Sequence, residues 1–220
     1  RPVIIGPVSF LLLAKKDGSQ LLRLLDLLLP VYEDLLSQLG AAEWIQIDEP
    51  CLVLDLSNEA RTAFQSAYER LAKVAVSPRK LVATYFGALG DNLDLACSLP
   101  VAGLHIDLVR APEQLEAVAK KLPKESYLSA GVVDGRNVWR NDLDASLKKL
   151  QKIAEIRGTD KLIVAPSCSL LHSPVDRATE TKLDAELKSW LAFATDKLDE
   201  VTVLAKALDA GHTDFPAFVE

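Results

Sequence analysis

A regular alternation of short apolar runs with longer amphipathic stretches most constrains how this 220-residue chain can fold. Six runs rich in β-branched residues predict strands at residues 3–5, 44–47, 81–86, 103–107, 127–133 and 162–165. Helical spacing of apolar residues follows at 20–39, 59–74, 92–97, from 112 onward, 142–156 and 180–208. Pro30 is expected to kink or split the first of these helices. Strands that alternate with helices in this way indicate parallel βαβ units.

The predicted fold class is α/β, with a parallel TIM-type (βα)8 barrel that is incomplete here. The strands are continuously apolar, as expected when both of their faces are covered. We count about six βα units, whereas a closed barrel has eight, so we expect the missing units to lie upstream of residue 1. A doubly wound open sheet is the alternative, but no G-x-G-x-x-G motif follows a predicted strand, so dinucleotide binding has no support.

Charge, hydropathy and cysteine usage exclude several functional classes. The net charge is −6 with scattered Lys and Arg, which argues against a nucleic-acid partner. No apolar run reaches the roughly 18 residues that a membrane span requires. Cys51, Cys97 and Cys168 are far apart and form no C-x-x-C pair, which is typical of a reducing cytoplasm and not of a disulfide framework.

Polar residues gather directly after the predicted strands. In a parallel barrel these strand ends meet at one rim, where barrel active sites lie, so carboxylates, an arginine and hydroxyls are expected to converge on one pocket. Ser9, Tyr85 and Arg110 also lie near strand ends. The candidate rim or substrate-side residues are Asp48, Glu49, Asp107, Asp134, Arg136, Asn137, Ser167 and Ser169.

Each candidate also has a structural interpretation. Asp48 and Glu49 are suited to acid–base chemistry or to binding a cationic group, but equally to accepting backbone N–H bonds. Arg136 can bind a carboxylate, or residues 134–137 can form a turn in which Gly135 supplies a positive φ and Asn137 caps the next segment. Cys168 can offer a thiolate, but a lone cysteine more often packs in the core.

The sequence predicts neither a metal site nor a nucleophilic catalytic residue in this chain. The three histidines are His105, His172 and His212, and no H-x-C pair accompanies them. His105 lies within a predicted strand, and Cys168 with His172 makes too few ligands for zinc. No G-x-S-x-G motif and no phosphate-binding glycine loop are present.

An ordered set of motifs resembles the N-terminal domain of cobalamin-independent methionine synthase. It consists of GPVSF at 6–10, WIQIDEP at 44–50, GVVDGRNVW at 131–139, SCSLLHSPVD at 167–176, KLD at 182–184 and KSWLAFA at 188–194. The resemblance implies that residues 1–211 form the C-terminal three-quarters of the family's N-terminal (βα)8 barrel. It also implies that residues 212–220 begin the interdomain linker.

The resemblance further implies an activity for the parent enzyme. That family moves a methyl group from 5-methyltetrahydrofolate polyglutamate to homocysteine without cobalamin, and zinc activates the thiol. The zinc ligands belong to the C-terminal catalytic barrel and are outside this chain. By analogy between the two barrels, Asp48 is the counterpart of a residue that contacts homocysteine. The implied partners are the upstream βα units, the C-terminal barrel and the small-molecule substrates, in the cytoplasm.

Three hypotheses follow. The first is a fragment of this methyltransferase that supplies scaffold and the folate-side domain and is inactive alone. The second is a self-sufficient barrel enzyme related to uroporphyrinogen decarboxylase, which requires a complete eight-strand barrel. The third is a non-catalytic domain that binds folate.

Overall fold

A computed structural model describes residues 1–15 and 21–210. All six predicted strands are present: β1 (Val3–Ile5), β2 (Trp44–Asp48), β3 (Arg79–Ala83), β4 (Gly103–Asp107), β5 (Tyr127–Val133) and β6 (Leu162–Pro166). They form one open sheet of parallel strands in the order β1-β2-β3-β4-β5-β6. β3 ends three residues earlier than predicted, at Ala83.

The strand order decides between the two predicted architectures. Each strand lies beside the one that precedes it in the sequence, and the order never reverses. A doubly wound sheet reverses its order at a switch point, whereas successive strands of a barrel are always neighbours. The predicted fold class, a parallel α/β barrel with about six βα units, is therefore confirmed, and the doubly wound alternative is wrong.

The helices alternate with the strands as predicted, with several differences in extent. The α-helices are α1 (Pro7–Leu13), α3 (Leu25–Gln38), α4 (Asn58–Leu71), α5 (Leu93–Ser98), α6 (Leu115–Lys121), α7 (Leu143–Arg157), α8 (Ala185–Trp190) and α9 (Ala194–Ala210). Short 3-10 turns are η1 (Leu22–Leu24), η2 (Pro50–Val53), η3 (Gly90–Asn92), η4 (Pro112–Gln114), η5 (Leu170–His172) and η6 (Arg177–Thr179). Helix α3 continues through Pro30 without splitting. None of the described helices is both long enough and apolar enough to cross a membrane.

The chain divides into two compact units. Unit 1 comprises residues 1–105 and 121–128, and unit 2 comprises 106–120 and 129–220. In unit 1, helices α1, α3 and α4 pack on one another. Its core includes fully buried side chains of β2, α3 and α4, namely Ile45, Ile47, Leu36, Phe64, Tyr68 and Leu71. The apolar periodicity that predicted these helices therefore marks their buried faces.

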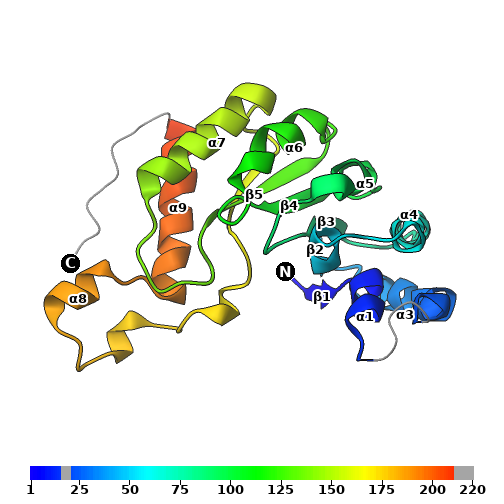
Figure 1. The fold of residues 1–220 in the computed structure, drawn as a ribbon, viewed down its shortest axis with the longest axis horizontal. Helices are drawn as coiled ribbons and strands as arrows, with labels where there is room; N and C mark the ends of the chain where they lie inside the picture. The colour runs from blue at the N-terminus through cyan, green and yellow to red at the C-terminus, as the bar shows by residue number, and fades with distance from the viewer. Residues whose placement is uncertain (16–20, 211–220) are drawn as a thin grey trace. The chain divides into compact units, whose positions relative to one another are not determined.

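Unit 2 contains helices α7 and α9, which pack side by side (Figure 1). Asp142 caps the N-terminus of α7, because its side chain accepts a hydrogen bond from the backbone N–H of Ala145. Gly158 ends α7 with a φ of 80°, a conformation that favours glycine. The core of this unit includes Val132, Leu147, Leu150, Ile153 and Leu204.

The predicted final helix at 180–208 is wrong. The structure has α8, then an extended break, then α9. Within the break, Leu191 forms an antiparallel bridge with Trp139, and the N–H of Ala192 donates to the carbonyl of Val138 at 2.9 Å. These tertiary hydrogen bonds outweigh the local helical preference. Asp184 starts α8 by accepting from the N–H of Leu187.

Helix α1 was not predicted from the sequence. Pro7 stands at its first turn, where a proline costs no hydrogen bond, and the seven-residue helix follows Gly6 directly. Its run of apolar residues is too short to establish a helical period. The predicted linker at 212–220 and His212 lie outside the described residues.

Candidate functional site

Asp48 ends β2 and is the half-buried member of the predicted acidic pair. Its Oδ1 accepts a hydrogen bond from Gln46 Nε2 at 2.8 Å, and its Oδ2 accepts one from the Tyr85 hydroxyl at 3.0 Å. Both partners lie in unit 1, and Tyr85 follows β3. The structure thus brings together the polar groups of Asp48 and Tyr85, which come from neighbouring strand ends.

Glu49 is completely buried and binds groups of the protein itself. Its Oε2 accepts from the backbone N–H of Ser9 in α1 at 2.8 Å, and its Oε1 accepts from the Tyr68 hydroxyl in α4 at 3.0 Å. Burial raises the pKa of Glu49 to about 7, although these hydrogen bonds oppose the rise. A Cβ on Gly6 would lie 2.0 Å from Glu49 Oε1, so the chain needs glycine there. This geometry suits a structural carboxylate.

Residues 134–137 form a turn that Asp134 organises. Its Oδ1 accepts from the N–H of Arg136 at 2.8 Å, and its Oδ2 accepts from Asn137 Nδ2 at 2.9 Å. The expected positive φ of Gly135 is wrong, since the positive-φ glycines among the described residues are Gly90 and Gly158. Glycine is required for a different reason, because a Cβ there would lie 2.9 Å from both the carbonyl oxygen and the sulfur of Cys168.

Ser167, the residue directly after β6, lies at the same turn. The buried Ser167 Oγ accepts from the N–H of Gly135 at 3.2 Å, and the Ser167 N–H donates to the carbonyl of Val133. The structure therefore brings Asp134, Arg136, Asn137 and Ser167 together in unit 2. The side chain of Arg136 is exposed at this turn, so a guanidinium is presented at the ends of β5 and β6.

The remaining candidates mainly order nearby backbone. Asp107 is buried at the end of β4, and its Oδ1 accepts from the N–H groups of Val109 and Arg110, both at 2.9 Å. Ser169 Oγ accepts from the N–H of Leu171 and so caps η5. Burial raises the pKa of the Cys168 thiol to about 11, which keeps it protonated at neutral pH and argues against a thiolate nucleophile.

Lys197 is a side chain of this cluster that the sequence did not reveal. It lies in the first turn of α9 with no exposed surface, and Nζ donates to Asn137 Oδ1 at 3.0 Å and to the carbonyl of Trp139 at 3.1 Å. Burial lowers its pKa, while Glu200 and Asp134 act in the opposite direction. A lysine in an amphipathic helix is typical of a solvated face, so only the fold could identify it.

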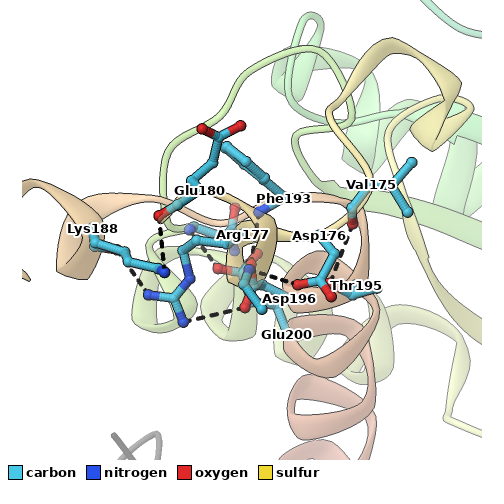
Figure 2. A network of polar contacts seen from close by, with 11 residues as sticks. Val175, Asp176, Arg177, Glu180, Lys188, Phe193, Thr195, Asp196 and Glu200 are labelled. Carbon is cyan, nitrogen blue, oxygen red and sulfur yellow. Dashed lines mark hydrogen bonds and ion pairs between the residues drawn. The ribbon is translucent and has the colours of Figure 1, made fainter. Parts of the chain in front are cut away.

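A polar network fixes the segment that runs from β6 to α9 (Figure 2). Arg177 pairs with Asp196 at 3.3 Å and donates to the carbonyl of Lys188 at 2.7 Å. Asp196 Oδ2 also accepts from the N–H of Phe193, which organises the start of α9. The N–H and the hydroxyl of Thr195 both donate to the carbonyl of Val175.

A cavity of about 390 Å³ lies among η4, α6 and α7, and none of the candidate residues lines it. Two of its lysines are already used, because Lys152 pairs with Glu116 and Lys149 donates to the carbonyl of Leu108. Within residues 1–15 and 21–210, no cluster of three or more His, Cys, Asp or Glu side chains is arranged to hold a metal. His105 is buried in β4, and the three cysteines are buried and form no disulfide.

Comparison with known proteins identifies relatives that are much longer than this chain. The 5-methyltetrahydropteroyltriglutamate–homocysteine methyltransferase of Nitrobacter winogradskyi is 56% identical over 216 residues. That alignment covers 96% of this chain but 28% of the relative. The protein of the same name from Mesorhizobium japonicum is 54% identical over 100% of this chain and 29% of its own length. The chain thus spans less than a third of these relatives.

Two solved structures share the fold. A B12-independent methionine synthase from a Shewanella species, in complex with selenomethionine, gives a TM-score of 0.64 at 14% identity. The match covers 96% of this chain and 63% of that one. A methyltransferase from Methanosarcina mazei gives a TM-score of 0.65 at 13% identity and covers 94% and 58%. At these identities the likeness supports the fold alone.

The family resemblance drawn from the ordered motifs is confirmed. The family model described as the N-terminal domain of cobalamin-independent synthase matches residues 1–158. The matched region contains the strand ends that carry Asp48, Glu49, Asp107 and the 134–137 turn. The chain therefore belongs to the cobalamin-independent synthase family, with the sequence of its N-terminal domain.

Proposed function

We propose that the polypeptide containing this chain transfers a methyl group from 5-methyltetrahydrofolate polyglutamate to homocysteine and forms methionine without cobalamin. The observation that carries this proposal is identity of 54–56% over 96–100% of the chain to relatives named for that reaction. At this level of identity along a single domain, a shared reaction is the simplest inference. We propose that residues 1–211 belong to one barrel of the enzyme and that residues 212–220 begin a linker.

Within that enzyme, this chain serves as scaffold and as the folate-side domain. The donor carries several carboxylates along its glutamate tail, and guanidinium groups bind carboxylates through paired hydrogen bonds. Arg136 is exposed on a turn that is ordered by Asp134, which supports a role in binding such a carboxylate. Asp48 in unit 1, and Asp107, Ser167 and Ser169 in unit 2, are proposed to lie on the substrate side of their own unit, and Glu49 is proposed to order unit 1.

The zinc of the proposed reaction is assigned to residues outside this chain. When bound, zinc activates the homocysteine thiol as a thiolate. The described residues do not fit such a site, because no three candidate ligands come together and the free thiol near the turn has a raised pKa. Among these residues we therefore name neither a metal ligand nor a catalytic residue.

The proposed partners are the rest of the polypeptide and the small-molecule substrates, in the cytoplasm. Strand β1 is at the edge of the sheet, and its Val3 and Ile5 side chains are 55% and 40% exposed. An apolar edge strand is a template for further strand pairing. Further barrel strands of the polypeptide would cover this edge. We expect the isolated 220-residue chain to dimerise or aggregate in light scattering, and a monodisperse monomer would contradict this expectation.

The decisive test is a methyl-transfer assay on the full-length polypeptide. The assay supplies homocysteine and 5-methyltetrahydrofolate triglutamate and measures methionine, with and without cobalamin and with and without a zinc chelator. We expect methionine without cobalamin and none after chelation. The 220-residue chain assayed alone is the matched control and should form none. A full-length protein that forms no methionine would overturn the proposed reaction. Methionine formation by the 220-residue chain alone would overturn the proposal that this chain is only the scaffold and the folate-side domain.

A further inference from the structure

We propose that Lys197 is a positioning residue that orients the 134–137 turn and thereby sets how Arg136 binds a carboxylate of the methyl donor. This inference rests on the proposed function and adds to it a residue from a distant helix. Lys197 lies in α9, about sixty positions along the sequence from the turn that it contacts. It touches neither substrate nor reacting atoms in this assignment.

The environment of Lys197 is unusual for a lysine. Its side chain has no exposed surface, and its ammonium group has two acceptors, Asn137 Oδ1 and the Trp139 carbonyl. Burying an ammonium group is costly unless hydrogen bonds and opposite charge compensate. Glu200, one turn further along α9 and 2% exposed, supplies part of the opposite charge. A residue needed only for packing at this position would be apolar.

A continuous chain of hydrogen bonds leads from Lys197 to the backbone of Arg136. Asn137 Oδ1 accepts from Lys197 and from the N–H of Trp139, and Asn137 Nδ2 donates to Asp134 Oδ2. Asp134 Oδ1 in turn accepts from the N–H of Arg136. The Asn137 amide is thereby fixed in one orientation, since exchanging its oxygen and nitrogen would oppose donor to donor at Lys197. Lys197 and the Trp139 N–H together fix which end of the Asn137 amide faces Asp134.

Groups other than Lys197 also hold the same segment. Ser173 Oγ donates to the carbonyls of Gly135 and Asn137, both at 3.2 Å. The N–H of Ala192 donates to the carbonyl of Val138, and the N–H of Asn141 donates to Glu200 Oε1 at 2.8 Å. Loss of the lysine is therefore expected to leave the segment folded and to loosen only the amide–carboxylate link at its centre.

The consequence concerns binding and not the chemical step. A guanidinium group binds a carboxylate best through two parallel hydrogen bonds, and this geometry is sensitive to the direction of the arginine backbone. A turn that samples several orientations presents Arg136 correctly for only part of the time. The apparent affinity for the donor is then multiplied by the fraction of molecules whose turn has the binding orientation. The rate of methyl transfer within the bound complex is unchanged.

The test compares Lys197→Met with Lys206→Met in the full-length polypeptide. Both variants remove one positive charge from α9, but Lys206 is exposed and far from the turn in sequence. Arg136→Gln and the double variant Lys197→Met/Arg136→Gln complete the cycle. For Lys197→Met we expect KM for 5-methyltetrahydrofolate triglutamate to rise about tenfold, with kcat within about twofold of wild type. Lys206→Met should match wild type, and the double variant should resemble Arg136→Gln alone.

Asn137→Ala provides a second route if Lys197→Met does not fold. It breaks the same link from the turn and leaves α9 intact, and it should raise the same KM. A lower kcat with an unchanged KM, or additive effects in the double variant, would overturn the inference and leave Lys197 as a purely structural residue. If the wild-type polypeptide forms no methionine, the proposed function fails first, and direct titration of folate triglutamate against the wild type and each variant still tests the positioning role.

Discussion

Glu49 and Lys197 are both buried ionisable side chains that hold a segment near a strand end, yet the regions around them are built in opposite ways. Glu49 follows β2 directly and reaches a neighbouring helix, α1, where it accepts from the N–H of Ser9. Lys197 comes from the distant helix α9 and reaches back to the turn after β5. In unit 1 the charged side chain, Glu49, stands at the strand end itself. In unit 2 the charged side chain, Lys197, comes from a helix and donates hydrogen bonds to the turn that follows the strand.

The difference explains what each group can do besides holding structure. Both oxygens of Glu49 are occupied by Ser9 and Tyr68 inside unit 1, and the side chain has no exposed surface. It has no capacity left for a ligand. In unit 2 the buried ammonium group of Lys197 contacts Asn137 and Trp139, whereas Arg136 of the same turn is exposed. A buried charged side chain on a distant helix can thus order a turn through hydrogen bonds on its buried side, while a residue on the exposed side of the turn stays in contact with solvent.

The largest expected effect is the loss of the carboxylate from unit 1. Glu49→Leu leaves the Ser9 N–H and the Tyr68 hydroxyl buried without their acceptor, and we expect it to destabilise unit 1 by about 3 kcal/mol. Hydrogen exchange of the α1 amides, followed by mass spectrometry, measures this opening locally. Glu49→Gln is the matched control, because it keeps an oxygen for Ser9 while Tyr68 can accept from the new amide. Equal exchange in the two variants would contradict the assigned hydrogen bonds.

The two regions should also respond to pH with opposite sign. The folded-state pKa of Glu49 is raised from 4.5 to about 7, so the folded state binds the extra proton between these values. Unit 1 should lose stability as the pH rises through this window, by up to about 1.4 kcal/mol per pH unit. The folded-state pKa of Lys197 is lowered, so the unfolded state binds the extra proton and unit 2 should gain stability as the pH rises towards 10.5.

Local exchange rates across pH, measured separately for α1 and for the start of α9, test this contrast. Glu49→Gln should flatten the acidic slope in α1 alone, and Lys197→Met should flatten the alkaline slope in α9 alone. If the exchange rates of α1 and of the start of α9 change with pH by the same slope, the net charge of the protein, and not these two groups, controls the pH dependence of stability.

Those two regions also differ in how far sequence could predict them. The strands were predictable because continuous apolar runs depend only on local composition, and Asp48 and Glu49 were visible as acids at a strand end. Lys197 was not, because its burial depends on Asn137 and Trp139, which are distant in sequence. The break between α8 and α9 was missed for the same reason, since Leu191 and Ala192 are held extended by residues 138–139.

Removing the lysine should cost less stability than removing the glutamate. Methionine has nearly the same shape as lysine, and the desolvation penalty of the ammonium disappears with the charge. The Trp139 carbonyl and Glu200 are left without their cation, so we expect Lys197→Met to destabilise unit 2 by about 1 kcal/mol. Lys197→Met/Glu200→Gln should recover part of this loss in urea unfolding. If the double variant is less stable than Lys197→Met, the charge of Glu200 stabilises unit 2 through its hydrogen bond from the Asn141 N–H and not through Lys197.

The smallest predicted effects compare one helix cap from each unit. Ser57 caps α4 in unit 1 by accepting from the N–H of Ala60 at 3.2 Å, and Asp142 caps α7 in unit 2 by accepting from Ala145 at 2.9 Å. The charged cap also interacts with the helix dipole, so Asp142→Ala should cost about 1 kcal/mol and Ser57→Ala about 0.5 kcal/mol. Salt should narrow this gap, because it screens the dipole interaction and leaves the hydrogen bonds in place. Exchange of the first-turn amides at low and high ionic strength measures both differences, and a gap that is independent of salt would mean that hydrogen-bond geometry alone separates the two caps.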